Sequence, residues 1–471
     1  MANNLGISYG HHDSAITLVK EDTGEVLFAS QEERFSGIKH DASFPKLTLK
    51  YVRNKYAIDN VTFFNKEDNF IDRYKTKKLL KKFINISNID FINHHDAHAY
   101  SSIGMNKGIP GAVMVADTKG GNYATSLGYW DGSNITWLKR FNYPNSLGLL
   151  YSAVTSFSGL RPLYDENIIM SASHYGKPIW SPLFKKHIVN YNSGNYKVIP
   201  KEYLINSIVG SGKINKVDFD LCASIQDTIE KIIVSLATWL KNETKTSILY
   251  YSGGLAYNCV ANSKLFSVFD DVFINPAAGD AGCAMGAAWN KNLKGTWENS
   301  FHGVYSDYTD DDIDKWVNYI KKGNIAFVIG GKAEWGPRAL GNRSLLCIPT
   351  KDNINKLNYI KNRIKDNWRP YAPMVLSEYA SDYYITKNKV SKEMLFTFDS
   401  MYSNNIFPTG RLQMVDSSQD IAYKILTKLK EYENCRVLIN TSLNERGKPI
   451  PNTRHDISLN WFDHIKDFVN F

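Results

Sequence analysis

Leu5-Gly6-Ile7-Ser8-Tyr9 is followed by the polar turn Gly10-His11-His12-Asp13-Ser14 and by a second apolar run, Ala15-Ile16-Thr17-Leu18-Val19. Two short apolar runs joined by a polar turn that contains glycine predict a β-hairpin. A third apolar run over residues 26–30 follows the turn at residues 22–24. The first 34 residues therefore predict a meander of three strands, and this meander decides the fold.

The same pattern recurs over residues 111–140. An apolar run at residues 112–116 enters the turn Asp117-Thr118-Lys119-Gly120-Gly121, and further runs follow at residues 124–130 and 135–138. Two similar meanders indicate an internal duplication. Duplicated meanders begin the two lobes of actin-like, sugar-kinase-like folds, whose first turns point backbone N–H groups at nucleotide phosphates. Two unrelated hairpins are the alternative.

Length and composition narrow the class of protein. A chain of 471 residues that is 43% hydrophobic predicts two or three domains. The sequence shows no secretory signal and no apolar run long enough for a membrane span, so we expect a cytoplasmic protein without membrane contact. The five cysteines are scattered without C-x-x-C spacing, which is typical of reduced thiols. The net charge of +9 suits a protein that binds several phosphates, and it also suits nucleic acid as a partner.

A pair of histidines is the first sign of chemistry. In His94-His95-Asp96-Ala97-His98-Ala99, His94 and His98 are four residues apart, so on a helix both imidazoles leave the same face. Asp117 and Asp280 each follow an apolar run and enter a glycine-rich turn, where ligand-binding carboxylates usually lie in α/β folds. We predict a divalent-metal site from these four residues. The alternative is a histidine pair that lies on a helix by accident.

A candidate nucleotide-binding turn lies between these aspartates. Residues 221–241 have helical apolar spacing, and the apolar strand at residues 247–251 runs into Ser252-Gly253-Gly254. Glycines directly after a strand and before a helix let a nucleotide approach the backbone closely. A strand, two glycines and a helix are weak evidence alone. Asp280 and the small-residue helix that follows Asp280 strengthen the prediction of a nucleotide-binding turn.

The C-terminal part reads as a separate domain. Residues 296–323 are polar and irregular, and we expect an actin-like domain over residues 1–300, a linker over 301–323 and a second domain over 324–471. The acidic run at residues 307–314 reads as a solvated linker or the start of a helix.

Basic residues interleaved with glycine and hydroxyl groups are concentrated in the second domain. Arginine suits bidentate phosphate contacts, so this density predicts a pocket for a polyphosphorylated ligand. The alternative is that each arginine makes an ordinary surface ion pair. The predicted phosphate-binding residues are Arg338, Arg363, Arg369, Arg411, Asn440, Ser442 and Arg446.

With these motifs in place, the sequence resembles the O-carbamoyltransferases of the NodU/CmcH type, known from nodulation-signal and antibiotic biosynthesis. The resemblance runs nearly end to end. It is carried by the segments at residues 32–41, 94–99, 144–148 with Tyr151, 253–258, 279–282, 334–344, 368–373 and 440–444.

The resemblance implies an α/β fold with an actin-like N-terminal domain similar to the tRNA threonylcarbamoyl-transferring ATPases, and an α+β YrdC-like C-terminal domain. It implies that the C-terminal domain forms carbamoyl-adenylate from carbamoyl phosphate and ATP and releases pyrophosphate. The N-terminal domain would then transfer the carbamoyl group to an acceptor hydroxyl at a metal site. Fe²⁺ is the metal that the family implies, with Mg²⁺ or Mn²⁺ as alternatives.

Carried over by motif position, the metal ligands are His94, His98, Asp117 and Asp280. Lys39, Arg338, Arg369, Arg411 and Arg446 would hold carbamoyl phosphate and the ATP phosphates, and Gly253, Gly254 and Asn258 would approach the nucleoside. His12 is the candidate base for the acceptor hydroxyl, since imidazole can take that proton near neutral pH. Its alternative role is that of a turn histidine that bonds its own backbone.

The sequence departs from the family pattern at three places. Arg363-Ile364-Lys365-Asp366 stands where the family usually has Lys-x-Arg-Glu, and Phe407-Pro408-Thr409-Gly410-Arg411 lacks a histidine. Ile168 replaces a lysine of the first domain. These changes concern the handling of the adenylate and the acceptor more than the reaction class.

Two other classes of function compete with the transferase. A nucleic-acid-binding module has no reason to keep four metal ligands, and an actin-like kinase or ATPase leaves the arginine pocket unexplained. The acceptor is open: a sugar or secondary-metabolite hydroxyl, or a hydroxymethyl-pyrimidine nucleotide or DNA base. We also leave a homodimer open as the assembly.

Overall fold

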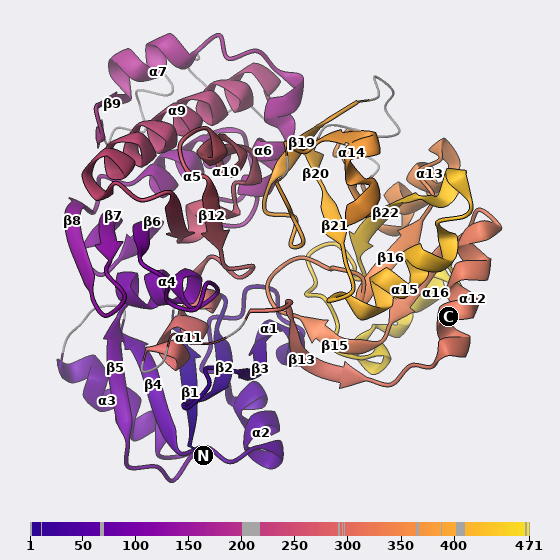
Figure 1. The fold of residues 1–471 in the computed structure, drawn as a ribbon, viewed down its shortest axis with the longest axis horizontal. Helices are drawn as coiled ribbons and strands as arrows, with labels where there is room; N and C mark the ends of the chain where they lie inside the picture. Colours follow the sequence, from indigo (N-terminus) through magenta and orange to yellow (C-terminus); the bar gives the residue numbers. More distant parts are fainter. Residues whose placement is uncertain are drawn as a thin grey trace. The chain divides into compact units, whose positions relative to one another are not determined.

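The computed structural model describes residues 2–470, except 11, 66–69, 200–216, 291–292, 294, 296, 364–366, 388, 402–409 and 467–468 (Figure 1). The chain forms two compact units, each of mixed α/β structure. Residues 1–61, 83–88 and 297–471 form the first unit, and residues 62–82 and 89–296 form the second. The predicted α/β class is confirmed. The predicted segments 1–300 and 324–471 do not coincide with these units, because the N-terminal strands group with the C-terminal residues.

The first unit begins with the predicted meander. Strand β1 (Asn3–Ser8) pairs antiparallel with β2 (Ala15–Lys20), which pairs antiparallel with β3 (Val26–Gln31). The buried positions of β1 include Leu5 and Ile7, both fully buried. Two short helices follow the meander: α1 (Glu33–Ser36) and α2 (Lys46–Lys55).

A six-stranded sheet forms the remainder of the first unit, with strand order β21-β17-β22-β16-β14-β23. Helices α12 and α15 cover one face of this sheet through a core that includes Ile313 and Ile425, and α13 and α16 cover the other through Leu357 and Trp461. The strands of this part are β13 (Phe301–Ser306), β14 (Ile325–Ile329), β15 (Gly331–Glu334), β16 (Arg343–Cys347), β17 (Ala372–Leu376), β18 (Tyr384–Ile385), β19 (Thr397–Ser400), β20 (Gly410–Arg411), β21 (Gln413–Val415), β22 (Val437–Ser442) and β23 (Val469–Asn470). Its helices are α12 (Asp310–Lys321), α13 (Lys351–Ile360), α14 (Ala380–Tyr383), α15 (Asp420–Leu429) and α16 (Leu459–Ile465).

The second unit contains the second meander. Strand β6 (Gly111–Gly120) pairs antiparallel with β7 (Tyr123–Trp130), which pairs antiparallel with β8 (Ile135–Asn142). On its other side, β6 pairs in parallel with β11 (Ile248–Ser252), so the sheet order is β12-β11-β6-β7-β8. The predicted repetition of the meander is therefore confirmed.

Long and short helices complete the second unit (Figure 1). The helix predicted over residues 221–241 is α9 (Phe219–Thr244), whose buried face includes Ile225, Ile229 and Leu236. The other elements are β4 (Asn60–Asn65, which starts in the first unit), α3 (Phe70–Leu80), β5 (Ile89–Asn93), α4 (His94–Ile103), α5 (Leu147–Phe157), α6 (Glu166–Ala172), α7 (Ser181–His187), β9 (Val189–Asn192), β10 (Asn195–Val198), α10 (Cys259–Lys264), β12 (Asp271–Ile274) and α11 (Asp280–Trp289).

The predicted linker, residues 301–323, holds β13 and α12. Its acidic run is the start of a helix. Thr309 caps α12 through a capping box with Asp312, and the three aspartates of the first turn favour the positive end of the helix dipole. Ile313, Val317 and Ile320 then bury the apolar face.

Thr309→Ala is expected to lower the free energy of unfolding by about 1 kcal/mol, because the substitution removes the side-chain acceptor of the Asp312 N–H. Urea unfolding followed by circular dichroism measures the change. Thr309→Ser keeps the hydroxyl and should stay close to the parent protein. An equal loss in both variants would contradict the role of the cap.

Candidate metal centre and anion-binding residues

Helix α4 carries the predicted histidine pair. It begins directly after β5, and Asn93 at its N-terminus has an extended conformation. His94 and His98 project from one face, and their rings stack with centroids 4.8 Å apart. Both side chains are buried, His98 completely.

Asp117 on β6 and Asp280 at the start of α11 reach this pair. His94 Nε2 lies 3.0 Å from His98 Nε2, 3.1 Å from Asp280 Oδ1 and 3.5 Å from Asp117 Oδ2. His98 Nε2 lies 3.5 Å from Asp280 Oδ1 and 3.6 Å from Asp117 Oδ2. The structure thus brings the four predicted ligands together within the second unit.

Two glycines of α11 allow this approach. A Cβ on Gly286 would lie 1.7 Å from the carbonyl oxygen of Ala97 on α4, and one on Gly282 would lie 2.2 Å from the carbonyl oxygen of Ala277. Only glycine fits such positions without moving the backbone. The small-residue helix that the sequence shows is therefore what lets α4 and α11 pack closely enough for their polar side chains to meet.

The site is strongly polarised. Burial alone lowers the pKa of His94, but the Asp280 carboxylate and the Cys283 thiol raise it to about 9. Burial likewise opposes the charge on His98, whose pKa is nevertheless raised well above its usual value by Cys283, Asp117 and Asp280. For Asp117, burial raises the pKa, but the hydrogen bond with His98 and the charges of His98 and His94 together lower it to about 2.

These residues fit a metal ion. Two ring nitrogens face each other at 3.0 Å, and two carboxylate oxygens lie beside them, so a cation among them would have four lone pairs directed at it. A cation with bonds of about 2.1 Å sets neighbouring ligand atoms about 3.0–3.4 Å apart, close to the distances found here. Imidazole and carboxylate together suit Fe²⁺, Mn²⁺ or Zn²⁺ better than a cation that prefers oxygen ligands alone.

Cys283 is the residue of this centre that the sequence reasoning missed. Atoms of His94, His98, Asp280 and Cys283 that can bind a metal all lie within 4.8 Å of one another. The signal was present, since Cys283 follows Asp280 by three residues on a helix and therefore shares its face. It had been interpreted only as one of several reduced thiols.

The predicted nucleoside-binding turn lies beside Asp117. Gly253 has a φ of +96°, and a Cβ there would lie 2.2 Å from the carbonyl oxygen of Ala116. The Gly254 N–H donates to Asp117 Oδ1 at 3.1 Å and so orients that carboxylate. Asn258 caps α10 by accepting from the Ala261 N–H, and its amide pairs with that of Gln226. Nucleoside contact by these residues stays a prediction.

In the first unit, His12 and Lys39 belong to one chain of hydrogen bonds. His12 Nδ1 lies 3.1 Å from Asp13 Oδ2, and His40 Nδ1 lies 2.7 Å from Asp13 Oδ1. Lys39 Nζ donates to Glu33 Oε1 at 2.9 Å, and Glu33 Oε2 accepts from the His40 N–H. Burial raises the pKa of Asp13, but the two histidines together lower it well below its usual range. Sequence reasoning identified the two basic residues and missed the carboxylates that hold them.

The predicted cations of the second domain lie near one another. Burial lowers the pKa of Arg363, and the charges of Arg411 and Arg446 add to this effect. Burial also lowers the pKa of Lys361 well below its usual value, with further contributions from Arg363 and Arg369. The sequence reasoning missed Lys361, whose Nζ donates to the Ser442 carbonyl oxygen and to Asn444 Oδ1, each at 2.8 Å. A bound anion would relieve the repulsion between these cationic side chains.

Three other predicted residues have structural contacts. Asn440 donates to the Ala339 carbonyl oxygen and to Gln413 Oε1. Ser442 donates to Asn444 Oδ1 at 2.6 Å. Arg446 donates to the Asn362 carbonyl oxygen at 3.4 Å and is exposed. Their phosphate contacts remain predictions.

The loop that carries Arg338 is held by buried charges. Glu334 Oε1 accepts from the N–H groups of Leu340, Asn342 and Arg343, and the Arg34 guanidinium donates to the Gly336 carbonyl oxygen at 2.7 Å. Arg343 is completely buried and donates to carbonyl oxygens that include those of Gly330 and Val304. Arg343 therefore holds backbone, which differs from the anion contact that its motif suggested.

The structure describes some of the residues at which the chain departs from the family pattern. Ile168 is buried in α6, where it packs into the core. Residues 364–366 and 402–409, which include Lys365 and Phe407, lie outside the described residues.

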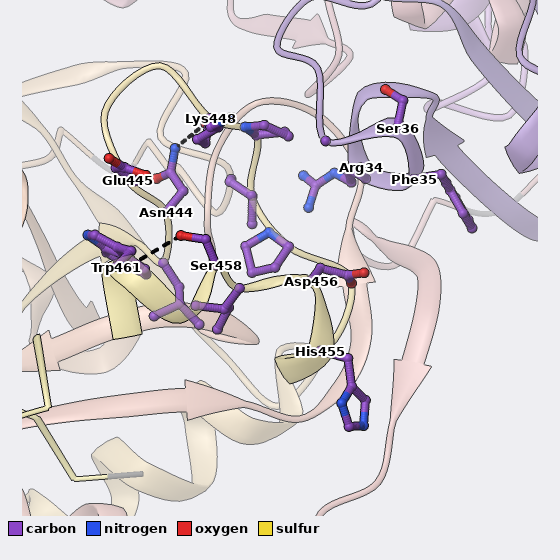
Figure 2. A pocket seen from close by; sticks show the side chains of 16 residues that line it. Arg34, Phe35, Ser36, Asn444, Glu445, Lys448, His455, Asp456, Ser458 and Trp461 are labelled. Atoms are coloured by element: carbon purple, nitrogen blue, oxygen red, sulfur yellow. Dashed lines mark hydrogen bonds between the residues drawn. The ribbon is translucent and has the colours of Figure 1, made fainter. Parts of the chain in front are cut away.

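A cavity of about 320 Å³ lies elsewhere in the first unit, and Figure 2 shows Arg34, Ser458 and Trp461 around it. Asn444, Lys448 and His455 also line it. The predicted site residues are not part of its lining.

Two family models match the chain. The model described as carbamoyltransferase N-terminus matches residues 3–79 and 53–289, and the model described as carbamoyltransferase C-terminus matches residues 317–467. No described helix has the length and apolar character that a membrane crossing requires.

The chain is also similar to individual proteins and solved structures. Nodulation protein NolNO of Sinorhizobium fredii is 27% identical, over 93% of this chain and 75% of its own length. A 3'-hydroxymethylcephem-O-carbamoyltransferase of Amycolatopsis lactamdurans is 26% identical, over 67% of this chain and 66% of its own length. Among solved structures, HypF of T. kodakarensis is 12% identical with a TM-score of 0.43, over 63% of this chain and 49% of that one. The two family models together span most of the sequence, and the chain belongs to the carbamoyltransferase family.

Proposed function

We propose that this carbamoyltransferase-family enzyme is an ATP-dependent O-carbamoyltransferase. Carbamoyl phosphate is hydrolysed to carbamate and phosphate, and the carbamate oxygen attacks the α-phosphorus of ATP, so that carbamoyl-adenylate forms and pyrophosphate leaves. The enzyme then transfers the carbamoyl group to an acceptor hydroxyl. One observation supports the proposal most: His94, His98, Asp117 and Asp280 converge from three separate elements in a chain of this family.

The cationic residues carry the first step in this proposal. Lys39, Arg338, Arg363, Arg369 and Arg411 hold the phosphates, and their charge stabilises the pyrophosphate as it leaves. The guanidinium of Arg363 lies 4.8 Å from the centre of the Tyr371 ring, which supports the side chain by a cation–π contact before ligand binds. A preorganised guanidinium loses little entropy when it binds a phosphate.

The transfer step needs a base and a Lewis acid. A bound metal would polarise the carbamoyl carbonyl and stabilise the charge that develops on its oxygen. His94, His98, Asp117 and Asp280 would hold that metal. His12 takes the proton of the acceptor hydroxyl as general base. The acceptor oxygen then bonds to the carbonyl carbon, and AMP leaves.

The test is release of pyrophosphate that depends on carbamoyl phosphate. The purified protein is incubated with ATP, with and without carbamoyl phosphate, and pyrophosphate is measured by a coupled assay. Release only with both substrates supports the proposal. Phosphate release from ATP alone indicates an ATPase, and no release with either excludes adenylate formation.

For the acceptor we propose a hydroxymethyl group, because the relative from A. lactamdurans is named for a hydroxymethyl substrate. The net charge of +9 suits a phosphorylated carrier of that group, such as a hydroxymethyl-pyrimidine nucleotide or DNA base. Mass spectrometry of reactions with such nucleotides, and with sugar hydroxyls as the second arm, detects the added carbamoyl group. A gain only on sugars would move the acceptor to that class.

Arg363→Met is expected to lower the rate of pyrophosphate release by about 10- to 100-fold, since a charge-assisted hydrogen bond is worth about 1.5–3 kcal/mol. The substitution keeps the length and packing of the side chain and removes its charge. Arg161→Met is the matched control, because the Arg161 side chain is 72% exposed and pairs only locally with Asp165. Equal rates in parent and Arg363→Met would exclude the phosphate role.

A further inference from the structure

We propose that Cys283 is a further ligand of the metal centre, and that its thiolate makes the centre selective for a borderline transition ion over Mg²⁺ or Ca²⁺. The inference rests on the metal centre of the proposed function and names a donor that the four predicted ligands do not include.

The position of the thiol supports this assignment. The Cys283 sulfur lies within 4.8 Å of the metal-binding atoms of His94, His98 and Asp280, and its side chain is completely buried. Ligands on opposite sides of one cation, with bonds of about 2.1–2.3 Å, lie about 4.4 Å apart, so the sulfur is close enough to share the ion.

The backbone directs the sulfur to this place. Cys283 follows Asp280 by one helical turn on α11, and Gly286 follows Cys283 by three residues on the same face. Because Gly286 contacts α4 at the Ala97 carbonyl oxygen, this face of α11 is the one that meets the histidines.

Packing alone is the competing explanation. Cys283 belongs to one cluster of buried residues with Phe64, Ile92, Ala97 and Ala287, so it also fills space in a small apolar core. The other four cysteines are buried as well. Among the described residues, however, Cys283 is the cysteine that belongs to a group of three or more possible ligands. Cys259, for comparison, has its sulfur 3.8 Å from that of Met170.

The donor set then determines the class of metal. Two imidazoles and a thiolate favour Fe²⁺, Co²⁺ or Zn²⁺, whereas Mg²⁺ and Ca²⁺ prefer oxygen ligands and keep water. Carboxylates from Asp117 and Asp280 balance the charge of a divalent ion without changing this preference.

The experiment uses Co²⁺ as a spectroscopic probe. Full-length protein is stripped with chelator and titrated with Co²⁺, and absorption is recorded for the parent, Cys283→Ser and the matched control Cys259→Ser. The parent and the control should show a sulfur-to-cobalt charge-transfer band that Cys283→Ser lacks. Competition with a coloured chelator should show at least about 10-fold weaker Co²⁺ binding by Cys283→Ser, with Mg²⁺ binding unchanged.

The outcomes distinguish a failure of the thiolate ligand from a failure of the metal centre itself. If the parent binds Co²⁺ without a sulfur band, or if Cys283→Ser keeps that band, the thiolate ligand is excluded and the four-residue centre stands. If the parent binds no Co²⁺, the metal centre itself fails, and the proposed transfer step fails with it. Should Cys283→Ser not fold, X-ray absorption of the Co²⁺-loaded parent decides, since a sulfur ligand lies at about 2.3 Å.

Discussion

His98→Ala is expected to lower the rate of carbamoyl transfer by about 10³-fold and to remove most of the bound metal. Lewis-acid stabilisation of a carbonyl is worth several kcal/mol, and each 1.36 kcal/mol corresponds to about a factor of ten in rate. The substitution removes a fully buried ring whose Nε2 lies within 3.6 Å of three other ligand atoms. Elemental analysis measures the metal, and carbamoylated product measures the rate.

The same variant should still release pyrophosphate from ATP and carbamoyl phosphate, because the cations assigned to that step belong to the other compact unit. His174→Ala is the matched control, since His174 is an exposed histidine of the same unit as His98. Full transfer activity by a metal-free His98→Ala protein would show that the centre takes no part in the reaction.

Glu334→Ala is expected to cost at least about 3 kcal/mol of unfolding free energy. Glu334 is completely buried, and Oε1 accepts three backbone hydrogen bonds from the loop that carries Arg338. Removing the carboxylate leaves those N–H groups without this acceptor and takes away one of the two negative charges, Glu334 and Glu33, that act on the buried Arg34. Urea unfolding gives the free energy, and pyrophosphate release reports whether Arg338 is still held in place.

Two comparisons make this prediction specific. Glu334→Gln keeps an acceptor oxygen and should recover part of the stability, whereas Glu298→Ala changes an exposed carboxylate and should have little effect. A Glu334→Ala protein as stable as Glu298→Ala would contradict the role of the buried carboxylate.

Much of the fold follows from local pattern. The two meanders were predictable because apolar runs alternate with polar turns, and α9 was predictable because its apolar residues recur at helical spacing. The start of α12 could not be predicted uniquely, because its three aspartates fit a solvated linker as well as the start of a helix. Those aspartates are favourable at a helix N-terminus, and Thr309 supplies the cap.

The sequence predicts those parts of the candidate site in which the spacing of residues on one element sets their relative position. It does not predict the contacts that join residues from distant segments. His94 and His98 share a helix face by spacing alone. The pairing of Lys39 with Glu33, the position of Asp13 between two histidines and the place of Lys361 beside Asn444 depend on tertiary contacts. Arg343 shows the converse case, because a motif rich in arginine gave no sign that this side chain would be buried among carbonyl oxygens.

The grouping of the first 61 residues with the C-terminal part has a consequence for synthesis of the chain. Arg34 donates to the carbonyl oxygen of Gly336, and its own carbonyl oxygen accepts from Asn452, 418 positions later. A chain that grows from its N-terminus cannot make these contacts until almost all of it has left the ribosome. The first unit therefore lacks these contacts through most of translation, and residues 62–82 and 89–296 form the unit that can complete its fold first.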